Sequence, residues 1–268
     1  MIRLMRRVVF WALSLVALSG IWANPSQARD FKVYGYATPH EGEVELVYWV
    51  DYFVKGNGDY TYLDGKIVDK DGLWRHTVEI EYGVTDRWTL AYYADFEQPS
   101  GEDFKYVQSR AVFLRYRLFE PGKRFFDPAI YLEYYLPKHD YRDNEHLEAR
   151  IILEKNMGPV QIRLNPILDK NLSGSSSTGS DVDEGMEFEY AAGVYFKGLG
   201  KVKPGVEFYG EMGQIGAFND PDQQEHFIFP TIKLDLPLNL EVETGVGFGL
   251  TAESDDLVIK GIFSYVYD

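Results

Sequence analysis

The sequence predicts an all-β protein, a single closed antiparallel transmembrane β-barrel of about twelve strands. Three observations predict this fold class. Apolar and polar residues alternate over most of the chain after residue 41, tight turns alternate with longer connections, and the chain opens on a segment typical of exported proteins. Alternation with a period of two marks a strand with one apolar and one polar face, whereas a helix needs apolar residues three and four apart.

The first 28 residues have the organisation of a secretory signal peptide. Three arginines within residues 1–7 precede an almost wholly apolar run at 8–23, and small residues flank the expected cleavage point after Ala28. The apolar run is shorter than the roughly 20 residues of a spanning helix, so a signal peptide is favoured over a membrane anchor. We therefore expect three regions: a signal peptide at 1–28, a short irregular N-terminal segment in the periplasm at 29–40, and the barrel at 41–268.

Composition excludes several classes of protein. The chain has 268 residues, no cysteine and a net charge of −15. Without cysteine there is no disulfide, no thiol nucleophile and no cysteine zinc site. The acidic excess argues against nucleic acid as a partner, because such binding needs Lys and Arg to neutralise phosphates.

The segment at 44–52 shows the strand pattern clearly. Valine, leucine and tyrosine occupy its even positions, whereas Glu43, Glu45 and Asp51 lie at odd positions. Similar alternation recurs along the rest of the chain. The expected strands have the approximate spans 41–54, 74–85, 88–98, 104–119, 127–138, 143–156, 159–172, 185–198, 203–216, 226–237, 240–252 and 257–268.

The connections between these strands differ in length with their position. Those after odd-numbered strands are mostly long, as at 55–73 and 173–184, whereas those after even-numbered strands are mostly tight, as at 85–87 and 157–158. An even number of strands with short periplasmic turns and longer extracellular loops is typical of outer-membrane barrels. Strands of this length also suffice to cross an apolar band about 25 Å tall at a tilt.

Aromatic residues and the end of the chain agree with this interpretation. The last segment alternates up to Tyr267 and resembles the C-terminal signal of the barrel-assembly machinery, although Asp268 follows the last aromatic residue. Rings near strand ends suit the headgroup level of a bilayer. The rings expected there are Tyr48, Trp49, Tyr52, Phe53, Trp88, Tyr92, Tyr93, Phe125, Phe126, Tyr134, Tyr135, Tyr265 and Tyr267.

A soluble periplasmic ligand-binding β-barrel, or a sandwich, is the alternative fold. In such a protein the apolar face points inward onto a core and the charged face meets water. Period-two alternation alone does not distinguish inside from outside. The length of the segments, their number and the asymmetry of the connections favour the membrane barrel.

Two segments resemble a known family. Residues 81–88 read Glu-Tyr-Gly-Val-Thr-Asp-Arg-Trp, and residues 245–251 are followed by Ser254-Asp255-Asp256 and the closing strand. Both are similar to parts of small Gram-negative outer-membrane barrels, nearest the MetA-pathway-of-phenol-degradation-like transporter family. The resemblance covers about a fifth of the chain. It implies an outer-membrane location and transport of small aromatic or hydrophobic compounds.

The polar face of the strands is the candidate functional site. If the apolar face meets lipid, these charged residues line the lumen, with acids on most strands and three arginines on one. They either pair across a narrow lumen and seal it, which makes a structural or adhesive barrel, or line a thin polar pore, which we favour. The expected pore-lining residues are Glu79, Glu81, Arg110, Arg115, Arg117, Glu133, Glu148, Arg150, Arg163, Glu187, Glu189, Glu207, Glu241 and Glu243.

No catalytic arrangement and no cofactor is expected. None of the five histidines has a serine two positions away, and the chain has no G-x-S-x-G motif. The acidic loops around 181–184 and 219–222 could hold Ca²⁺ through oxygen atoms, but neither fits the EF-hand pattern, so a solvated loop is favoured. The sequence therefore predicts a narrow channel or transporter whose partners are outer-membrane lipid, the barrel-assembly machinery and a small solute.

Overall fold

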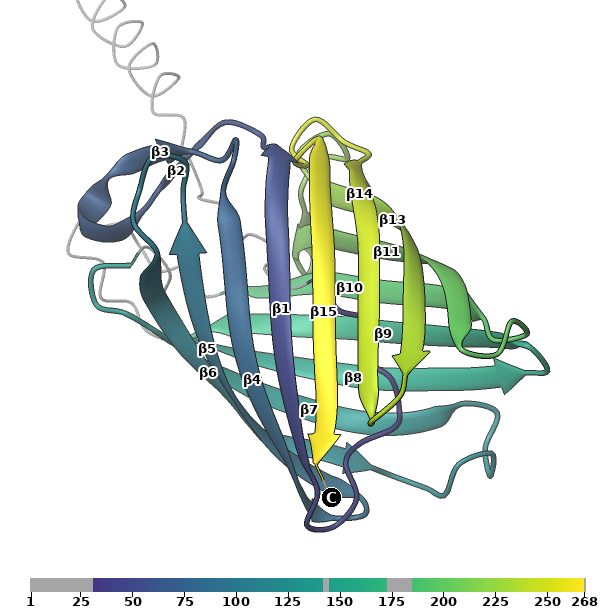
Figure 1. Ribbon diagram of the computed structural model, residues 1–268. Coiled ribbons are helices and arrows are strands. Elements are labelled where there is room, and N and C mark those ends of the chain that lie inside the picture. Colours follow the sequence, from purple (N-terminus) through teal and green to yellow (C-terminus); the bar gives the residue numbers. More distant parts are fainter. Residues whose placement is uncertain (1–30, 142–144, 173–184, 268) are drawn as a thin grey trace, which may run out of the picture.

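The computed structural model describes residues 31–141, 145–172 and 185–267. In these residues twelve long strands form one closed antiparallel barrel, as the sequence predicts (Figure 1). Every expected strand is present, with boundaries within a few residues of those predicted. The strands are β1 (Val44–Lys55), β4 (Trp74–Thr85), β5 (Trp88–Gln98), β6 (Lys105–Arg117), β7 (Asp127–Pro137), β8 (His146–Met157), β9 (Val160–Asn171), β10 (Met186–Phe196), β11 (Val202–Gln214), β13 (Glu225–Leu236), β14 (Leu240–Gly249) and β15 (Leu257–Tyr267).

The ring closes through its first and last strands. Each long strand pairs with its neighbours along the chain, and β1 pairs with both β4 and β15. The β1–β15 register runs from Val44 opposite Tyr267 to Lys55 opposite Leu257. A closed ring leaves no unpaired strand edge, which a chain surrounded by hydrocarbon requires.

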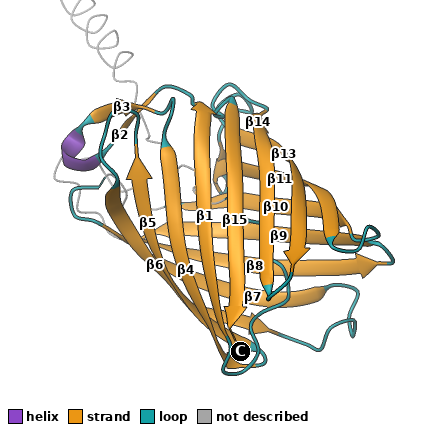
Figure 2. Cartoon of the chain, in the orientation of Figure 1, coloured by secondary structure: helices purple, strands orange, loops and turns teal. Residues whose placement is uncertain are grey.

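Three short strands and a turn of 3₁₀ helix complete the described elements (Figure 2). The connection between β1 and β4 contains β2 (Asp59–Thr61), η1 (Leu63–Gly65) and β3 (Ile67–Asp69). β12 (Ala217–Phe218) pairs with the end of β11. In the described ranges, no helix has the length and apolar character needed to span a membrane.

The two ends of the barrel differ. Tight turns join β4 to β5, β8 to β9 and β13 to β14, and the C-terminus lies at this same end (Figure 1). We call it the short-turn end. The opposite end carries the longer connections, including the β1–β4 connection with its small sheet, and we call it the long-loop end. Its β1–β4 connection is tied to a neighbouring loop, because Lys70 Nζ lies 3.1 Å from Asp255 Oδ1.

The apolar face of the strands points outward. Val78 is 45% exposed and the next residue, Glu79, is 0% exposed. The same contrast holds on β15, where Ile259 is exposed and Lys260 is buried. A soluble barrel would have the reverse orientation. The exposed apolar wall and the charged interior are those of a transmembrane barrel.

Four aromatic residues correct the predicted interfacial belt. Trp49, Phe53, Tyr93 and Tyr135 are buried inside the barrel and do not lie at the headgroup level. Each follows a second aromatic residue, and successive side chains of a strand point to opposite faces. In each such pair only one ring can face lipid: Tyr92 is 52% exposed and Tyr93 is 0% exposed.

Residues 31–40 are a second correction. The sequence places them in the periplasm, but the chain runs inside the barrel, where Phe31, Val33, Tyr34 and Tyr36 are all buried, and leaves it at His40, which is exposed. Figure 1 shows the start of the described chain in purple, reaching β1 from the short-turn end. We call residues 31–40 the lumenal segment. The expected signal peptide lies outside the described residues.

Candidate functional site

The centre of the lumenal segment is held by a side chain of the barrel wall. Asn165, at the middle of β9, accepts a hydrogen bond from the backbone N–H of Tyr34 (2.8 Å) and donates one to the carbonyl of the same residue (3.1 Å). An amide side chain can do both because it carries a donor and an acceptor. Asn165 therefore replaces the neighbouring strand that an extended backbone normally pairs with.

Charged side chains pair with four more backbone groups of the segment. Arg115 donates to the carbonyls of Gly35 (3.0 Å) and Ala37 (2.8 Å). Glu154 accepts from the backbone N–H of Tyr36 (3.1 Å), and Lys260 donates to the carbonyl of Phe31 (2.9 Å). Buried backbone groups need such partners. The segment is therefore a specifically bound peptide and not loosely trapped chain.

Two glycines let the segment lie close to the wall. A Cβ at Gly35 would lie 2.7 Å from the guanidinium carbon of Arg163, which also donates to the carbonyl of Val33 (3.4 Å). A Cβ at Gly83 would lie 1.9 Å from the carbonyl oxygen of His40, where the chain leaves the lumen. A larger residue at Gly83 would push the segment away from the wall, whereas one at Gly35 would displace the Arg163 guanidinium.

The side chains of the segment fill the middle of the barrel. The Tyr34 ring lies 4.6 Å from the guanidinium of Arg150, and its hydroxyl lies 3.2 Å from that of Tyr93. Phe31 lies nearer the long-loop end, where its ring packs 4.7 Å from Phe229 and 5.2 Å from Phe227. These contacts leave little space in the lumen around Tyr34 and Phe31.

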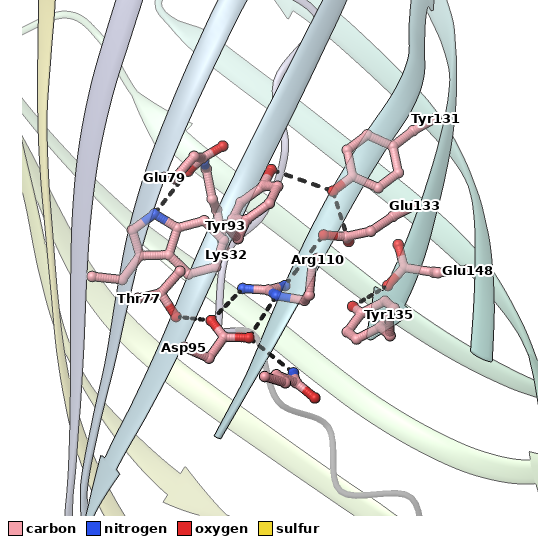
Figure 3. A network of polar contacts seen from close by, with 12 residues as sticks. Lys32, Thr77, Glu79, Tyr93, Asp95, Arg110, Tyr131, Glu133, Tyr135 and Glu148 are labelled. Carbon is pink, nitrogen blue, oxygen red and sulfur yellow. Dashed lines mark hydrogen bonds and ion pairs between the residues drawn. The ribbon is translucent and has the colours of Figure 1, made fainter. Parts of the chain in front are cut away.

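A buried ion-pair network lies beside the segment (Figure 3). Arg110 Nε lies 2.9 Å from Asp95 Oδ2, and Arg110 Nη1 lies 3.5 Å from Glu133 Oε1. Thr77 and Gln108 donate further hydrogen bonds to Asp95 (2.6 and 2.8 Å). Charge-assisted and multiply hydrogen-bonded contacts of this kind hold a buried guanidinium in one geometry.

The opposite wall holds a second network. Lys233 and Lys260 each lie 2.5 Å from a carboxylate oxygen of Glu243. Lys260 also contacts Glu207, which accepts a hydrogen bond from the Tyr209 hydroxyl (2.6 Å). Two lysines share two carboxylates here, so the local charge is balanced.

All fourteen predicted pore-lining residues belong to strands whose polar face points inward. Arg117 lies with its guanidinium 5.6 Å from the Tyr36 ring, and Glu241 is exposed at the short-turn end. The buried ones are Glu79, Glu81, Arg110, Arg115, Glu133, Glu148, Arg150, Glu207 and Glu243, and those of intermediate exposure are Arg117, Arg163, Glu187 and Glu189. That they line a path for a solute stays a prediction.

Acidic residues gather on one part of the wall. Glu133 lies opposite Glu148, Glu148 opposite Asp169, and Asp169 opposite Glu187, across strands β7 to β10. The arginines do not form a separate wall. Arg150 lies in the same region and contacts Glu148 at 2.8 Å, so acids and bases alternate within short distances.

The lumenal segment and the wall residues that bind it were not predicted from the sequence. Lys32 and Tyr34 were not expected in the lumen, and Asn165 was not among the expected pore-lining residues. Lys32 Nζ lies 2.8 Å from Glu79 and 4.5 Å from the Trp49 ring. The available signal was the clustering of bulky apolar residues at 31–36, directly after the expected cleavage point, which is unusual for solvated chain.

A cavity of about 570 Å³ lies beside the lumenal segment. It extends from Asn239, in the β13–β14 turn at the short-turn end, to Lys32 and Val33 deep in the barrel. The segment forms one side, β1, β13, β14 and β15 form most of the other, and Glu81, Arg115 and Arg163 of β4, β6 and β9 complete the lining. We call this cavity the vestibule. The vestibule runs only part of the way through the barrel. The packed residues around Phe31 close the remaining part.

No metal site is found in the part of the chain that the structure describes. No group of three or more His, Asp or Glu side chains there is placed to hold a metal ion. The acidic loop at 181–184 lies outside the described residues. Ser254 and His226 are neighbours, but the Ser254 hydroxyl donates to the His226 carbonyl and not to its ring (2.9 Å).

The barrel is similar to solved outer-membrane channels. The COG4313 outer membrane channel from Pseudomonas putida F1 has 14% sequence identity and a TM-score of 0.57, and the match covers 89% of this chain and 100% of that one. The chain has the fold of an outer-membrane β-barrel. The KdgM porin matches with 9% identity, a TM-score of 0.54 and coverage of 84% and 99%. The NanC porin matches with 5% identity, a TM-score of 0.53 and coverage of 82% and 98%.

Identities this low establish the fold alone. No family model matches the chain, and no curated protein matches it significantly.

Proposed function

We propose that the protein is an outer-membrane channel or transporter for small molecules, and that the lumenal segment closes it in the described state. The observation that carries this proposal is the way the segment is bound. Side chains hold its backbone, and the wall strands pair with one another without it. The segment can therefore leave without breaking the sheet.

The vestibule supports the same proposal. It already gives a solute access to the barrel interior from the short-turn end, as far as Lys32. Displacement of the segment would join this cavity to the region around Phe31 and the long-loop end. A purely structural barrel has no need for such a cavity.

The proposal also covers the family, the solute, the export and the assembly of the protein, as the sequence predicts them. We place the chain in the MetA-pathway-of-phenol-degradation-like family, with small aromatic or hydrophobic solutes and no enzymatic activity. The signal peptide would direct it to export from a Gram-negative cytoplasm, and the alternating strand that ends at Tyr267 would engage the barrel-assembly machinery.

A sealed structural barrel is the second candidate, and the Arg110 network favours it. Arg110, Glu133 and Tyr131 are completely buried, and their side chains contact one another across β6 and β7. A lumen packed in this way on all sides would not conduct. The vestibule is a part of the lumen that this packing does not fill.

Conductance in planar bilayers tests the proposal. A double variant, Tyr34→Ala with Asn165→Ala, loosens the segment, and we expect its open probability to rise at least tenfold over that of the unmodified chain. Tyr92→Ala is the matched control because it removes the same side chain from the outer face. If neither the chain nor the double variant conducts or admits solutes into liposomes, the sealed barrel replaces the channel.

A further inference from the structure

We propose that the vestibule is a binding site for small organic cations with an apolar body, which enter from the short-turn end. This inference deepens the proposed function and rests on it for the role of the site. The charges, the apolar lining and the size of the cavity support it.

The basic groups of the vestibule are already neutralised. Lys233 contacts Glu243 at 2.5 Å, and Lys32 contacts Glu79 at 2.8 Å. Arg115 contacts Glu81 at 2.8 Å and also donates to two backbone carbonyls of the segment. An incoming anion would have to compete with these close carboxylates.

Arg163 is the fourth base and is also engaged. It contacts Glu154 at 3.1 Å and donates to the carbonyl of Val33. No basic side chain that lines the vestibule is therefore left to pair with an anionic ligand.

Three carboxylates of the vestibule have no cationic partner within salt-bridge distance among the described residues. Glu43 accepts a hydrogen bond from the backbone N–H of His40 (2.7 Å), and Glu45 accepts one from Ser264. Glu241 lies opposite Asp235 and Ser264 in the sheet. A hydrogen bond from a neutral donor does not neutralise a carboxylate, so the cavity keeps an excess of negative charge.

The charged groups of the vestibule face an apolar surface. Val47, Leu240, Ile262 and Val266 line the same cavity. A ligand with an ammonium group and a hydrocarbon body could thus place each part against matching protein groups. The volume of about 570 Å³ lies within the range of small-molecule sites and accepts a molecule with one aromatic ring.

A ligand pair of equal shape and opposite charge tests the proposal. We expect titration calorimetry of the full-length protein in detergent to show 2-phenylethylammonium binding at least tenfold more tightly than phenylacetate. In a Glu45→Gln, Glu241→Gln variant this preference should fall at least fivefold. The control is Glu187→Gln, which removes a lumenal carboxylate outside the vestibule and should keep the preference.

Chemical labelling gives an independent measurement, because the chain has no cysteine of its own. In Ser264→Cys, a cationic methanethiosulfonate should react several-fold faster than an anionic one of similar size, and bound 2-phenylethylammonium should slow both reactions. In the background of the Glu45→Gln, Glu241→Gln variant the difference between the two reagents should shrink.

Two results would overturn the proposal: equal or tighter binding of phenylacetate, or equal labelling rates for the two reagents. Both measurements are independent of conduction. Loss of conductance with cation binding retained would therefore contradict only the proposed function. Conductance without a preference for the cation would contradict only this inference.

Discussion

The two sides of the lumen are built from the same kind of strand, yet one is packed and the other is open. On the packed side, Tyr93, Tyr131 and Arg150 contact Tyr34, and Arg110 lies over the Tyr93 ring. On the open side, β1, β14 and β15 supply both charged and aliphatic side chains, and the vestibule remains. A polar lumen is thus not by itself a pore.

The largest expected effect is on the packed side. Arg110→Met leaves the buried carboxylates of Asp95 and Glu133 without their cation, which should lower the free energy of unfolding by about 3–5 kcal/mol. Urea unfolding of the refolded barrel, followed by its heat-dependent electrophoretic mobility, measures this. The Arg110→Met, Asp95→Asn variant should recover part of the loss. An unchanged midpoint in Arg110→Met would show that the network contributes nothing.

The next effect compares the two sides directly. Ala129→Leu adds volume where the wall is packed and should destabilise the barrel by about 1–3 kcal/mol. Ile262→Phe adds volume next to the vestibule, and the change should stay below about 1 kcal/mol because the ring can enter the cavity. The same unfolding assay applies to both variants. Equal losses would contradict the distinction between a packed and an open side.

A smaller effect isolates the lumenal segment from the wall. Asn165→Leu removes both hydrogen bonds to Tyr34, and the segment should loosen by about 1–3 kcal/mol. Hydrogen–deuterium exchange of residues 31–40 should become several-fold faster, while exchange in β4 and β5 stays unchanged. Asn171→Leu, on the same strand but without a contact to the segment, serves as the control. Faster exchange throughout the wall would mean that segment and sheet form one cooperative unit.

The smallest effect concerns the exit of the segment at the short-turn end. The backbone N–H of Glu41 and the ring of His40 donate to Asp86, and these bonds hold the pKa of that exposed carboxyl below its usual 3.8. A lowered pKa gives stability that is present above the unfolded value and is lost as pH falls through the folded value. At neutral pH, Asp86→Asn should therefore speed exchange of the Glu41 amide slightly. As pH falls through the lowered pKa of Asp86, the variant and the unmodified chain should converge.

The strands were predictable because their boundaries depend on local pattern. The expected segments 74–85 and 88–98 coincide with β4 and β5, since apolar alternation and the turn after Thr85 are both visible in the sequence. The orientation of Glu79 followed from the same period of two. Each of these features needs only neighbouring residues.

The content of the lumen was not predictable in the same way. The position of Tyr34 depends on Asn165 and Arg115, which lie on distant strands, and no local pattern specifies that contact. The burial of Trp49 and Tyr93 was within reach, because each follows an outward-facing aromatic residue. A consistent use of alternation would have placed both rings inside the barrel.

The pairing of β1 with β15 has a consequence for biogenesis. The ring is completed only when strands from opposite ends of the described chain meet, and residues 31–40 directly precede the first of these strands. The segment that fills the lumen is therefore joined along the chain to one of the two strands that close the ring.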